Sequence, residues 1–337
     1  ATPAYILQSS KRYAKIQENH GCYYTIAAHP CQEFFSKVLQ VGEKRSMAQR
    51  RLTELSYIRE IMQQQQTHFK KKYGQNFLCE AAVPARIAAE CGAKPGSGIL
   101  EIGPGVGALS QCLCERFPKV VAVEIDTNMV NILAKTMADC ENFKVIEQDI
   151  LKCDLPALIA SEFAGRPVSV CANLPYYITT PVLMKLLESR AGFDSITVMV
   201  QKEVASRLCA APGSAQYGAV TASVGYYASA KKLFDVPAGC FVPAPKVDSA
   251  VICLSLYQKP PVHVAREAML FSVIRGAFAQ RRKTLQNSLA SALPSFGKEA
   301  IGDALSAAGI EKTRRGETLS LADFAAIADA LSTQNHR

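Results

Sequence analysis

The sequence lacks the features that would place the protein in a membrane or in a secretory pathway. No run of about 18 apolar residues occurs among the 337 residues, which excludes a membrane-spanning helix. The first thirty residues contain no continuous apolar stretch behind a basic start, which argues against a secretory signal. Glycine (20 residues) and proline (17 residues) occur at ordinary levels, which excludes collagen-like and low-complexity chains. We therefore expect a cytoplasmic globular protein without membrane contact.

The sequence also lacks the ligand pairs that bind a structural metal. None of its 12 cysteines forms a Cys-x-x-Cys pair, the closest spacing being Cys112 and Cys114, and its five histidines are scattered. No zinc pattern is complete, so we predict no metal site. Several cysteines, such as Cys171 and Cys253, lie within apolar runs, where a free thiol behaves as a small buried hydrophobic group. We interpret them as reduced thiols of a cytosolic protein.

The balance of charge allows a polyanionic partner without requiring one. The chain carries 38 Lys and Arg against 29 Asp and Glu, a net charge of +9, and 49% of its residues are hydrophobic. This hydrophobic content excludes wholesale disorder. The positive charge is compatible with a nucleic-acid partner and equally with a solvated basic surface.

The first three-quarters of the chain divide into an unpatterned segment and an alternating one. Residues 1–46 show no hydrophobic period, and we expect a flexible N-terminal extension, with an artificial leader or an added RNA-binding arm as alternatives. Within 47–258, strands are predicted at 99–102, 120–124, 143–146, 168–172, 196–200, 229–236 and 247–256, with helices at 52–66, 81–91 and 127–139. Short, continuously apolar strands separated by helices are typical of an α/β fold with a mainly parallel sheet.

The strand pattern stops near residue 260. Behind Pro260 and Pro261, apolar residues from 270 to 278 recur at helical spacing, and Ser320 opens a further helix with a capping-box pattern. We therefore predict a small all-helical domain over residues 259–337.

A glycine-rich turn joins the strand at 99–102 to the following helix. Its sequence, Glu-Ile-Gly-Pro-Gly-Val-Gly at residues 101–107, places glycines at 103, 105 and 107. Glycines at such a turn let the backbone bend tightly and approach a ligand closely. The spacing is GxGxG and differs from the GxGxxG of dinucleotide-binding turns, so no pyrophosphate cradle is required.

Two carboxylates end the next two predicted strands. Glu124 can accept hydrogen bonds from both ribose hydroxyls of a nucleoside, and Asp149 can accept one from an adenine amino group. Because the carboxyl ends of parallel strands share one edge of a sheet, we expect both beside the glycine turn. The three elements together describe a site for an adenosine without phosphates.

The tetrapeptide Asn-Leu-Pro-Tyr at 173–176 ends a fourth strand. An exocyclic amine is a poor nucleophile while its lone pair is conjugated with the ring. The side-chain oxygen of Asn173 and the next backbone carbonyl can accept both of its N–H bonds, which favours a pyramidal nitrogen. Tyr176 can stack on the base or face a cationic sulfonium. Alignment of the reacting atoms would then supply most of the catalysis.

These motifs resemble those of the S-adenosylmethionine-dependent rRNA adenine N6-dimethyltransferases, across about residues 50–330. The matching stretches are Gly-Gln-Asn-Phe-Leu at 74–78, the turn at 101–107, Glu124, Asp149, residues 173–177, Phe-Val-Pro-Ala-Pro-Lys-Val-Asp-Ser at 241–249, and residues 282–285. The resemblance implies a Rossmann-like methyltransferase sheet over 47–258, and an rRNA-binding role for the helical domain at 259–337.

The resemblance also implies roles for individual residues. S-adenosylmethionine would be bound by Asn76, Leu78, Gly103, Gly105, Glu124, Asp149 and Asn173. The target amine would be held by Asn173, Leu174, Pro175 and Tyr176, and the base pocket would be lined by Tyr176 and Phe241. We predict RNA contacts from two basic clusters, Lys70, Lys71 and Lys72, and Arg275, Arg281, Arg282 and Lys283.

The implied reaction is the transfer of two methyl groups to each of two adjacent adenosines. These lie in the 3′-terminal hairpin loop of small-subunit (16S) rRNA, within a late 30S assembly intermediate, and we expect a monomeric enzyme. One alternative is the Erm type, which methylates large-subunit (23S) rRNA. Another is a non-catalytic ribosome-assembly or transcription factor on the same fold, which would be expected to have lost the glycine turn or Asn173.

Overall fold

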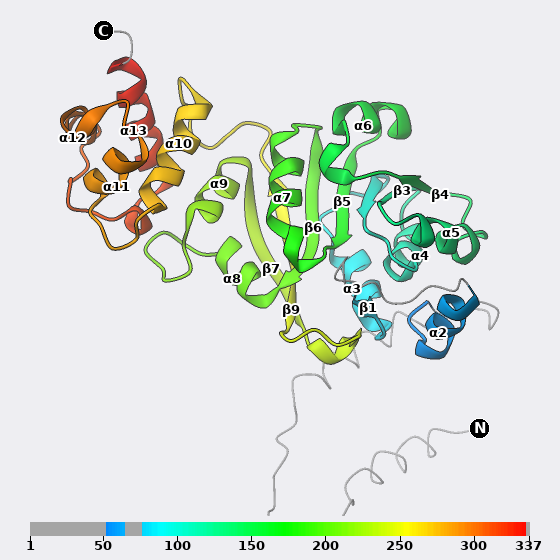
Figure 1. Ribbon diagram of the computed structural model, residues 1–337. Helices are drawn as coiled ribbons and strands as arrows, with labels where there is room; N and C mark the ends of the chain where they lie inside the picture. Colours follow the sequence, from blue (N-terminus) through cyan, green and yellow to red (C-terminus); the bar gives the residue numbers. More distant parts are fainter. Residues whose placement is uncertain (1–51, 65–75, 335–337) are drawn as a thin grey trace, which may run out of the picture. The chain divides into compact units, whose positions relative to one another are not determined.

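The structure, a computed structural model, describes residues 52–64 and 76–334 of the chain. The predicted extension at 1–46 lies outside the described residues, as do Lys70, Lys71 and Lys72. The described part contains a seven-stranded sheet between helices, followed along the chain by helices alone (Figure 1). Among the described helices, none is long and apolar enough to cross a membrane.

The large sheet has five parallel strands and an antiparallel extension at one edge. Its strands are β2 (Gly98–Ile102), β3 (Lys119–Glu124), β4 (Phe143–Glu147), β5 (Val168–Asn173), β6 (Phe193–Gln201), β7 (Ala228–Val236) and β9 (Ser249–Leu256). Their order is β4-β3-β2-β5-β6-β9-β7, and β9 runs antiparallel to both of its neighbours. Central strands are continuously apolar because both sheet faces are covered, and β2 is buried at all five positions. The predicted α/β fold is confirmed.

Helices cover both faces of this sheet (Figure 1). They are α3 (Ala82–Glu90), α4 (Ala108–Cys114), α5 (Thr127–Thr136), α6 (Leu155–Phe163), α7 (Thr179–Glu188), α8 (Lys202–Leu208) and α9 (Ala219–Tyr227), whereas α2 (Leu55–Gln64) shares a separate core with α5. Successive strand residues point to opposite faces. Leu100 and Ile102 accordingly pack in one core with α6 and α7, whereas Ile99 packs in another with α3 and α4.

A separate two-stranded ribbon joins two distant parts of the sequence. It pairs β1 (Phe77–Leu78) with β8 (Phe241–Val242), in the register Phe77 with Val242 and Leu78 with Phe241. The Cys79 amide extends the pairing by donating to the Cys240 carbonyl at 2.9 Å. The ribbon therefore brings Phe77 and Leu78, from the motif at 74–78, next to the first residues of the motif at 241–249.

The last four helices share a core with the preceding part of the chain. They are α10 (Glu267–Phe278), α11 (Leu285–Ala292), α12 (Gly297–Ala307) and α13 (Leu321–Gln334). Their core also contains Tyr217, Ala222 and Tyr226, and the Tyr226 hydroxyl donates to Glu267 at 2.8 Å. The predicted division at 258/259 thus separates strands from helices along the sequence, while the packed core crosses it.

Helix ends differ from the sequence prediction where the chain turns towards the next strand. The helix predicted at 127–139 ends at Thr136, because Met137 leaves helical geometry with φ −110° and the Cys140 amide turns back to the Met137 carbonyl. The predicted capping box is confirmed, since Asp323 N donates to Ser320 Oγ at 3.1 Å and Ser320 N donates to Asp323.

The ten described cysteines are free thiols, and Cys171 and Cys253 are buried.

Candidate active site

One cavity of about 290 Å³ lies at the carboxyl edge of the large sheet. It is lined by every residue that the sequence analysis assigned to the cofactor or to the target amine and base, namely Asn76, Leu78, Gly103, Gly105, Glu124, Asp149, Asn173, Leu174, Pro175, Tyr176 and Phe241. The strands β4, β3 and β2 are neighbours, so their ends do lie side by side as expected. The structure brings the residues together; their roles stay predictions.

The order of the strands explains why the cavity forms here. The chain proceeds from β2 to β3 and β4 on one side, and then returns to place β5 on the other side of β2. The loops after β2 and β5 therefore leave the sheet in opposite directions and open a crevice between them. Such a switch point is where open α/β sheets bind ligands.

The glycine turn after β2 needs backbone angles that other residues rarely adopt. Gly103 and Gly105 have φ of +65° and +58°, in the left-handed region. A Cβ at Gly103 would meet no protein atom within 4 Å, whereas at Gly105 it would approach the Phe77 ring at 3.3 Å. The turn therefore presents bare backbone to the cavity, which lets a ligand approach closely.

Glu124 is held at the end of β3 by backbone amides. Its Oε1 accepts from Ile125 N at 2.8 Å and from Asp126 N at 2.9 Å, and the side chain is only 7% exposed. Burial raises the pKa of Glu124, while the amides of Asp126, Ile125 and Gly105 oppose this rise. The carboxyl group is thus fixed in one place on the cavity wall, as a hydrogen-bond acceptor for a bound ligand must be.

Glu101 is a cavity residue that the sequence analysis did not assign to the site. It is 1% exposed, and its Oε2 has no hydrogen-bond partner within the described residues. Burial raises the pKa of Glu101 to about 8, and the negative charge of Glu124 adds to the rise. The sequence shows that Glu101 lies on the strand directly before the glycine turn, but it does not show that the side chain is buried.

Asp149 lies beyond the end of β4 and caps a short 3-10 turn, η4 (Ile150–Lys152). Its Oδ1 accepts from Leu151 N at 3.0 Å, and Lys152 approaches Oδ2 at 4.0 Å. Two exposed apolar residues lie on the same side of the cavity, Ile125 at 50% and Leu151 at 38% exposure. Ile125 directly follows Glu124, and Leu151 comes two residues after Asp149, so their places beside the two carboxylates could have identified them from the sequence as ligand-contacting residues.

The tetrapeptide at 173–176 closes the opposite side of the cavity. Asn173 Nδ2 donates to the Asn76 carbonyl at 3.5 Å, so the amide presents its oxygen, Oδ1, on the other side. Leu174 is 1% exposed and anchors the loop in the core. The Pro175 carbonyl accepts from Ile178 N and from Thr179, which leaves the Leu174 carbonyl as the neighbouring acceptor candidate.

Aromatic side chains flank this tetrapeptide. Tyr176 begins the turn η5 (Tyr176–Ile178), is half-buried, and has its hydroxyl 2.7 Å from Ser249 Oγ. Phe241 is buried on the ribbon, and Tyr177 is 60% exposed at the cavity. A flat, partly apolar lining of this kind suits a planar ring system.

The four predicted basic residues that the structure describes do not line the cavity. Arg275 is on α10, and the other three described members, Arg281, Arg282 and Lys283, lie in the turn before α11. All four are exposed, and none of them lines the cavity. In the described ranges, no group of three or more His, Cys, Asp and Glu side chains is arranged to hold a metal ion.

Sequence comparison identifies the family. The profile of the family described as "Ribosomal RNA adenine dimethylase" matches residues 66–330. A protein of Shouchella clausii named "Ribosomal RNA small subunit methyltransferase A" is 50% identical over 264 residues, which is 78% of this chain and 89% of that protein. Its namesake from Alkaliphilus metalliredigens is 45% identical over 267 residues, covering 79% of this chain and 93% of that protein.

Solved structures agree with this assignment. A dimethyladenosine transferase from Plasmodium falciparum superposes with a TM-score of 0.64 at 25% identity, over 74% of this chain and 95% of that one. The 23S rRNA methyltransferase ErmE superposes with a TM-score of 0.58 at 25% identity, over 76% of this chain and all of that one. The chain belongs to the ribosomal RNA adenine dimethylase family and is an S-adenosylmethionine-dependent methyltransferase.

Proposed function

We propose that this enzyme dimethylates the N6 amines of two adjacent adenosines in the 3′-terminal hairpin loop of small-subunit (16S) rRNA. The proposal rests on one observation: Asn173, Glu124 and the glycine turn line the same cavity. The names of the relatives at 45% and 50% identity support the small subunit as the source of the rRNA.

The cavity residues fit S-adenosylmethionine by their hydrogen-bonding groups. Glu124 places a buried acceptor on the wall, and Glu101 Oε2 has no hydrogen-bond partner among the described residues, which favours a ligand that brings polar groups to this wall. Glu124 would accept from the ribose hydroxyls, and Asp149 from the adenine amine. Gly103 and Gly105 would admit the ligand against the backbone. When bound, the cofactor supplies an electrophilic methyl group on sulfur.

Asn173 and Leu174 would prepare the target amine. The Asn173 amide is oriented by its bond to Asn76, so Oδ1 can accept one N–H bond of the adenine amine while the Leu174 carbonyl accepts the other. Both bonds draw the nitrogen out of conjugation with the ring and direct its lone pair. A general base is not required, because the proton can leave after the transfer.

The target adenine must leave its stack to reach these acceptors. Tyr176 and Phe241 would line the pocket that receives it, with Pro175 fixing the turn between acceptors and ring. Lys70, Lys71, Lys72, Arg275, Arg281, Arg282 and Lys283 would contact phosphates outside the cavity. We propose a monomeric, cytoplasmic enzyme that acts on a late 30S assembly intermediate, with the helices over 259–337 as its rRNA-binding part.

Mass spectrometry of rRNA fragments tests this proposal. The protein is incubated with S-adenosylmethionine and either unmethylated small subunits or unmethylated large subunits. We expect the 3′-terminal hairpin fragment of the small-subunit rRNA to gain two methyl groups on each of two adjacent adenosines.

The alternatives predict different products. Methylation of large-subunit rRNA alone would establish the Erm-type activity. The structural similarity to ErmE supports this alternative. Absence of any transfer would favour a non-catalytic assembly or transcription factor. The intact glycine turn and Asn173 argue against that last alternative.

A further inference from the structure

Asp248 and Ser249 lie outside the cavity. Ser249 hydrogen-bonds to Tyr176, and Asp248 hydrogen-bonds to the turn that leads into Phe241. Ser249 is the first residue of β9 and Asp248 directly precedes it, and neither is among the residues that line the cavity. The proposed base pocket, in contrast, depends on Tyr176 and Phe241, which come from separate loops. The separation of these two rings therefore depends on contacts outside their own loops.

Ser249 is bonded directly to the first wall. Its hydroxyl lies 2.7 Å from the Tyr176 hydroxyl, and the residue is fully buried. Its backbone is paired on both sides, with Gln201 of β6 and with Val236 of β7. Tyr176 itself belongs to a single 3-10 turn, which by itself restrains a long side chain weakly. The hydroxyl pair thus ties the far end of the ring to the interior of the sheet.

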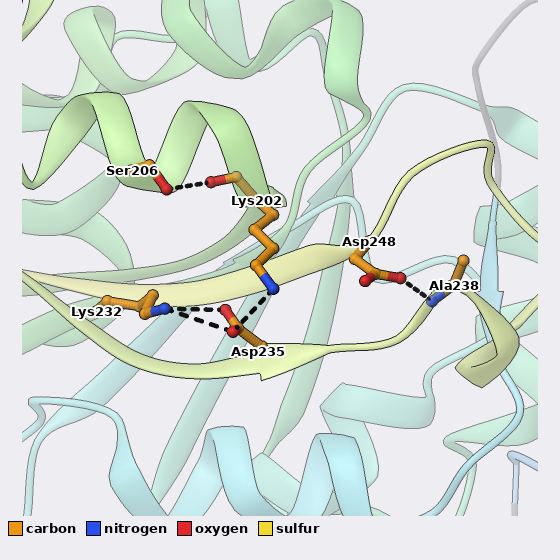
Figure 2. Close-up of polar contacts among 6 residues, drawn as sticks. All are labelled: Lys202, Ser206, Lys232, Asp235, Ala238 and Asp248. Carbon is orange, nitrogen blue, oxygen red and sulfur yellow. Dashed lines mark hydrogen bonds and ion pairs between the residues drawn. The ribbon is translucent and has the colours of Figure 1, made fainter. Parts of the chain in front are cut away.

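Asp248 supports the second wall through the backbone. Its Oδ1 accepts from Ala238 N at 3.0 Å, and Figure 2 shows the carboxylate turned towards that amide. Ala238 begins the turn η6 (Ala238–Cys240), which leads directly into Phe241. The Asp248 carbonyl accepts from Lys202 N at 3.0 Å, so the residue is also held to the end of β6. Asp248 therefore closes the base of the loop that carries Phe241.

Asp235 is a carboxylate of the same region that lacks such a connection. It accepts from Lys202 Nζ at 3.1 Å and from Lys232 Nζ at 3.2 Å, and Figure 2 shows it facing these two lysines and away from the Ala238 turn. All three of these side chains are more than one-third exposed. Asp235 consequently offers a matched control for Asp248.

We propose that Asp248 and Ser249 are positioning residues that set the separation and angle of the Phe241 and Tyr176 walls of the base pocket. The inference rests on the proposed function, because it concerns how the target adenine is held. The methyl-accepting nitrogen must reach Asn173 with little angular freedom, and misplacement by about 1 Å can lower a rate about a hundredfold. Ser249 on β9, and Asp248 directly before it, give both walls a common point of attachment.

A double-mutant cycle tests the tie between Ser249 and Tyr176. Ser249→Ala, Tyr176→Phe and the double variant each remove the hydroxyl pair and leave the aromatic ring in place. We expect each to lower kcat by roughly tenfold, the double variant to be no slower than the slower single variant, and S-adenosylmethionine affinity to stay unchanged. Ser249→Thr, which keeps the hydroxyl, restores most of the rate. Ser255→Ala, an exposed change on the same strand, has no effect. Multiplied losses in the double variant would overturn the proposal.

Asp248 is tested by variants that keep or remove its acceptor oxygen. Asp248→Asn retains Oδ1 and is expected to behave nearly as the native enzyme, whereas Asp248→Ala raises KM for the rRNA severalfold. Asp235→Ala leaves KM unchanged. Equal KM values for Asp248→Ala and Asp235→Ala would contradict the role of Asp248.

A measurement independent of turnover separates this inference from the proposed function. In protein labelled with ¹³C at the tyrosine ζ carbon, Tyr176→Phe identifies the Tyr176 signal. Burial raises the pKa of Tyr176 and the Ser249 bond opposes the rise, so Ser249→Ala should move its titration to higher pH. An unchanged Tyr176 signal in Ser249→Ala refutes the tie. Failure of the native enzyme to methylate small subunits refutes the proposed function alone.

Discussion

Replacement of Glu101 by Gln should remove a pH dependence from the stability of the protein. Burial raises the pKa of this carboxyl from 4.5 to about 8, with the charge of Glu124 as a further cause. The unfolded chain loses the proton near its ordinary pKa, while the folded chain retains it. The folded state therefore binds more protons between the two values, and its stability falls as pH rises.

The size of this effect follows from the two pKa values. Each unit of pKa corresponds to 1.36 kcal/mol, so a rise of about 3.5 units amounts to a loss of about 5 kcal/mol once pH exceeds the folded value. The stabilisation is fully present below about pH 4.5 and is lost as pH rises through about 8. From about pH 5 to about pH 8, Glu101→Gln should gain about 3 kcal/mol in unfolding free energy relative to the native protein.

Urea unfolding at several pH values measures this difference. Far-UV circular dichroism is the suitable signal, because the chain contains no Trp. Other titrating groups are common to both proteins and cancel when the two free energies are subtracted. Glu141→Gln, which removes an exposed carboxyl, serves as the control. If the free energies of native protein and Glu101→Gln stayed parallel across this range, Glu101 would not be a buried neutral acid.

Three further outcomes are expected. Glu124→Ala should weaken S-adenosylmethionine binding by about 1–3 kcal/mol through lost hydrogen bonds to the ribose, and calorimetry giving equal affinity would refute that assignment. Asn173→Ala should retain cofactor binding while transfer of a radiolabelled methyl group collapses; unchanged turnover would contradict the positioning of the amine. Neutralising the three basic residues at 281–283 should reduce the slope of log K against log salt concentration by roughly 2 units, from about 0.7 for each phosphate contact in single strands. An unaltered slope would place the RNA elsewhere.

The parts of the fold that follow from local pattern could be predicted from the sequence. The parallel strands are continuously apolar and bounded by turns, so β2, β3 and β5 were located within one or two residues. The glycine turn, Glu124 and Asn173 each stand at a strand end, and parallel topology brings such ends together. Most of the proposed site was therefore accessible from periodicity, from the motifs and from the family resemblance.

Features that depend on tertiary contacts were missed. The β1–β8 ribbon has only two residues in each strand, too few for a period, and its partners lie more than 160 positions apart. The raised pKa of Glu101 results from complete burial, which no local pattern reports. Likewise, the core shared by α9 and the C-terminal helices requires knowledge of which helix faces meet.

That shared core determines how the protein can be divided. A proteolytic or recombinant fragment ending before Pro260 would expose Tyr217, Ala222 and Tyr226, which are at most 5% exposed in the intact chain. An uncovered apolar face of this kind promotes aggregation. The methyl-transferring portion and its C-terminal helices should consequently melt in a single transition, and neither is suited to exchange as a module between related enzymes.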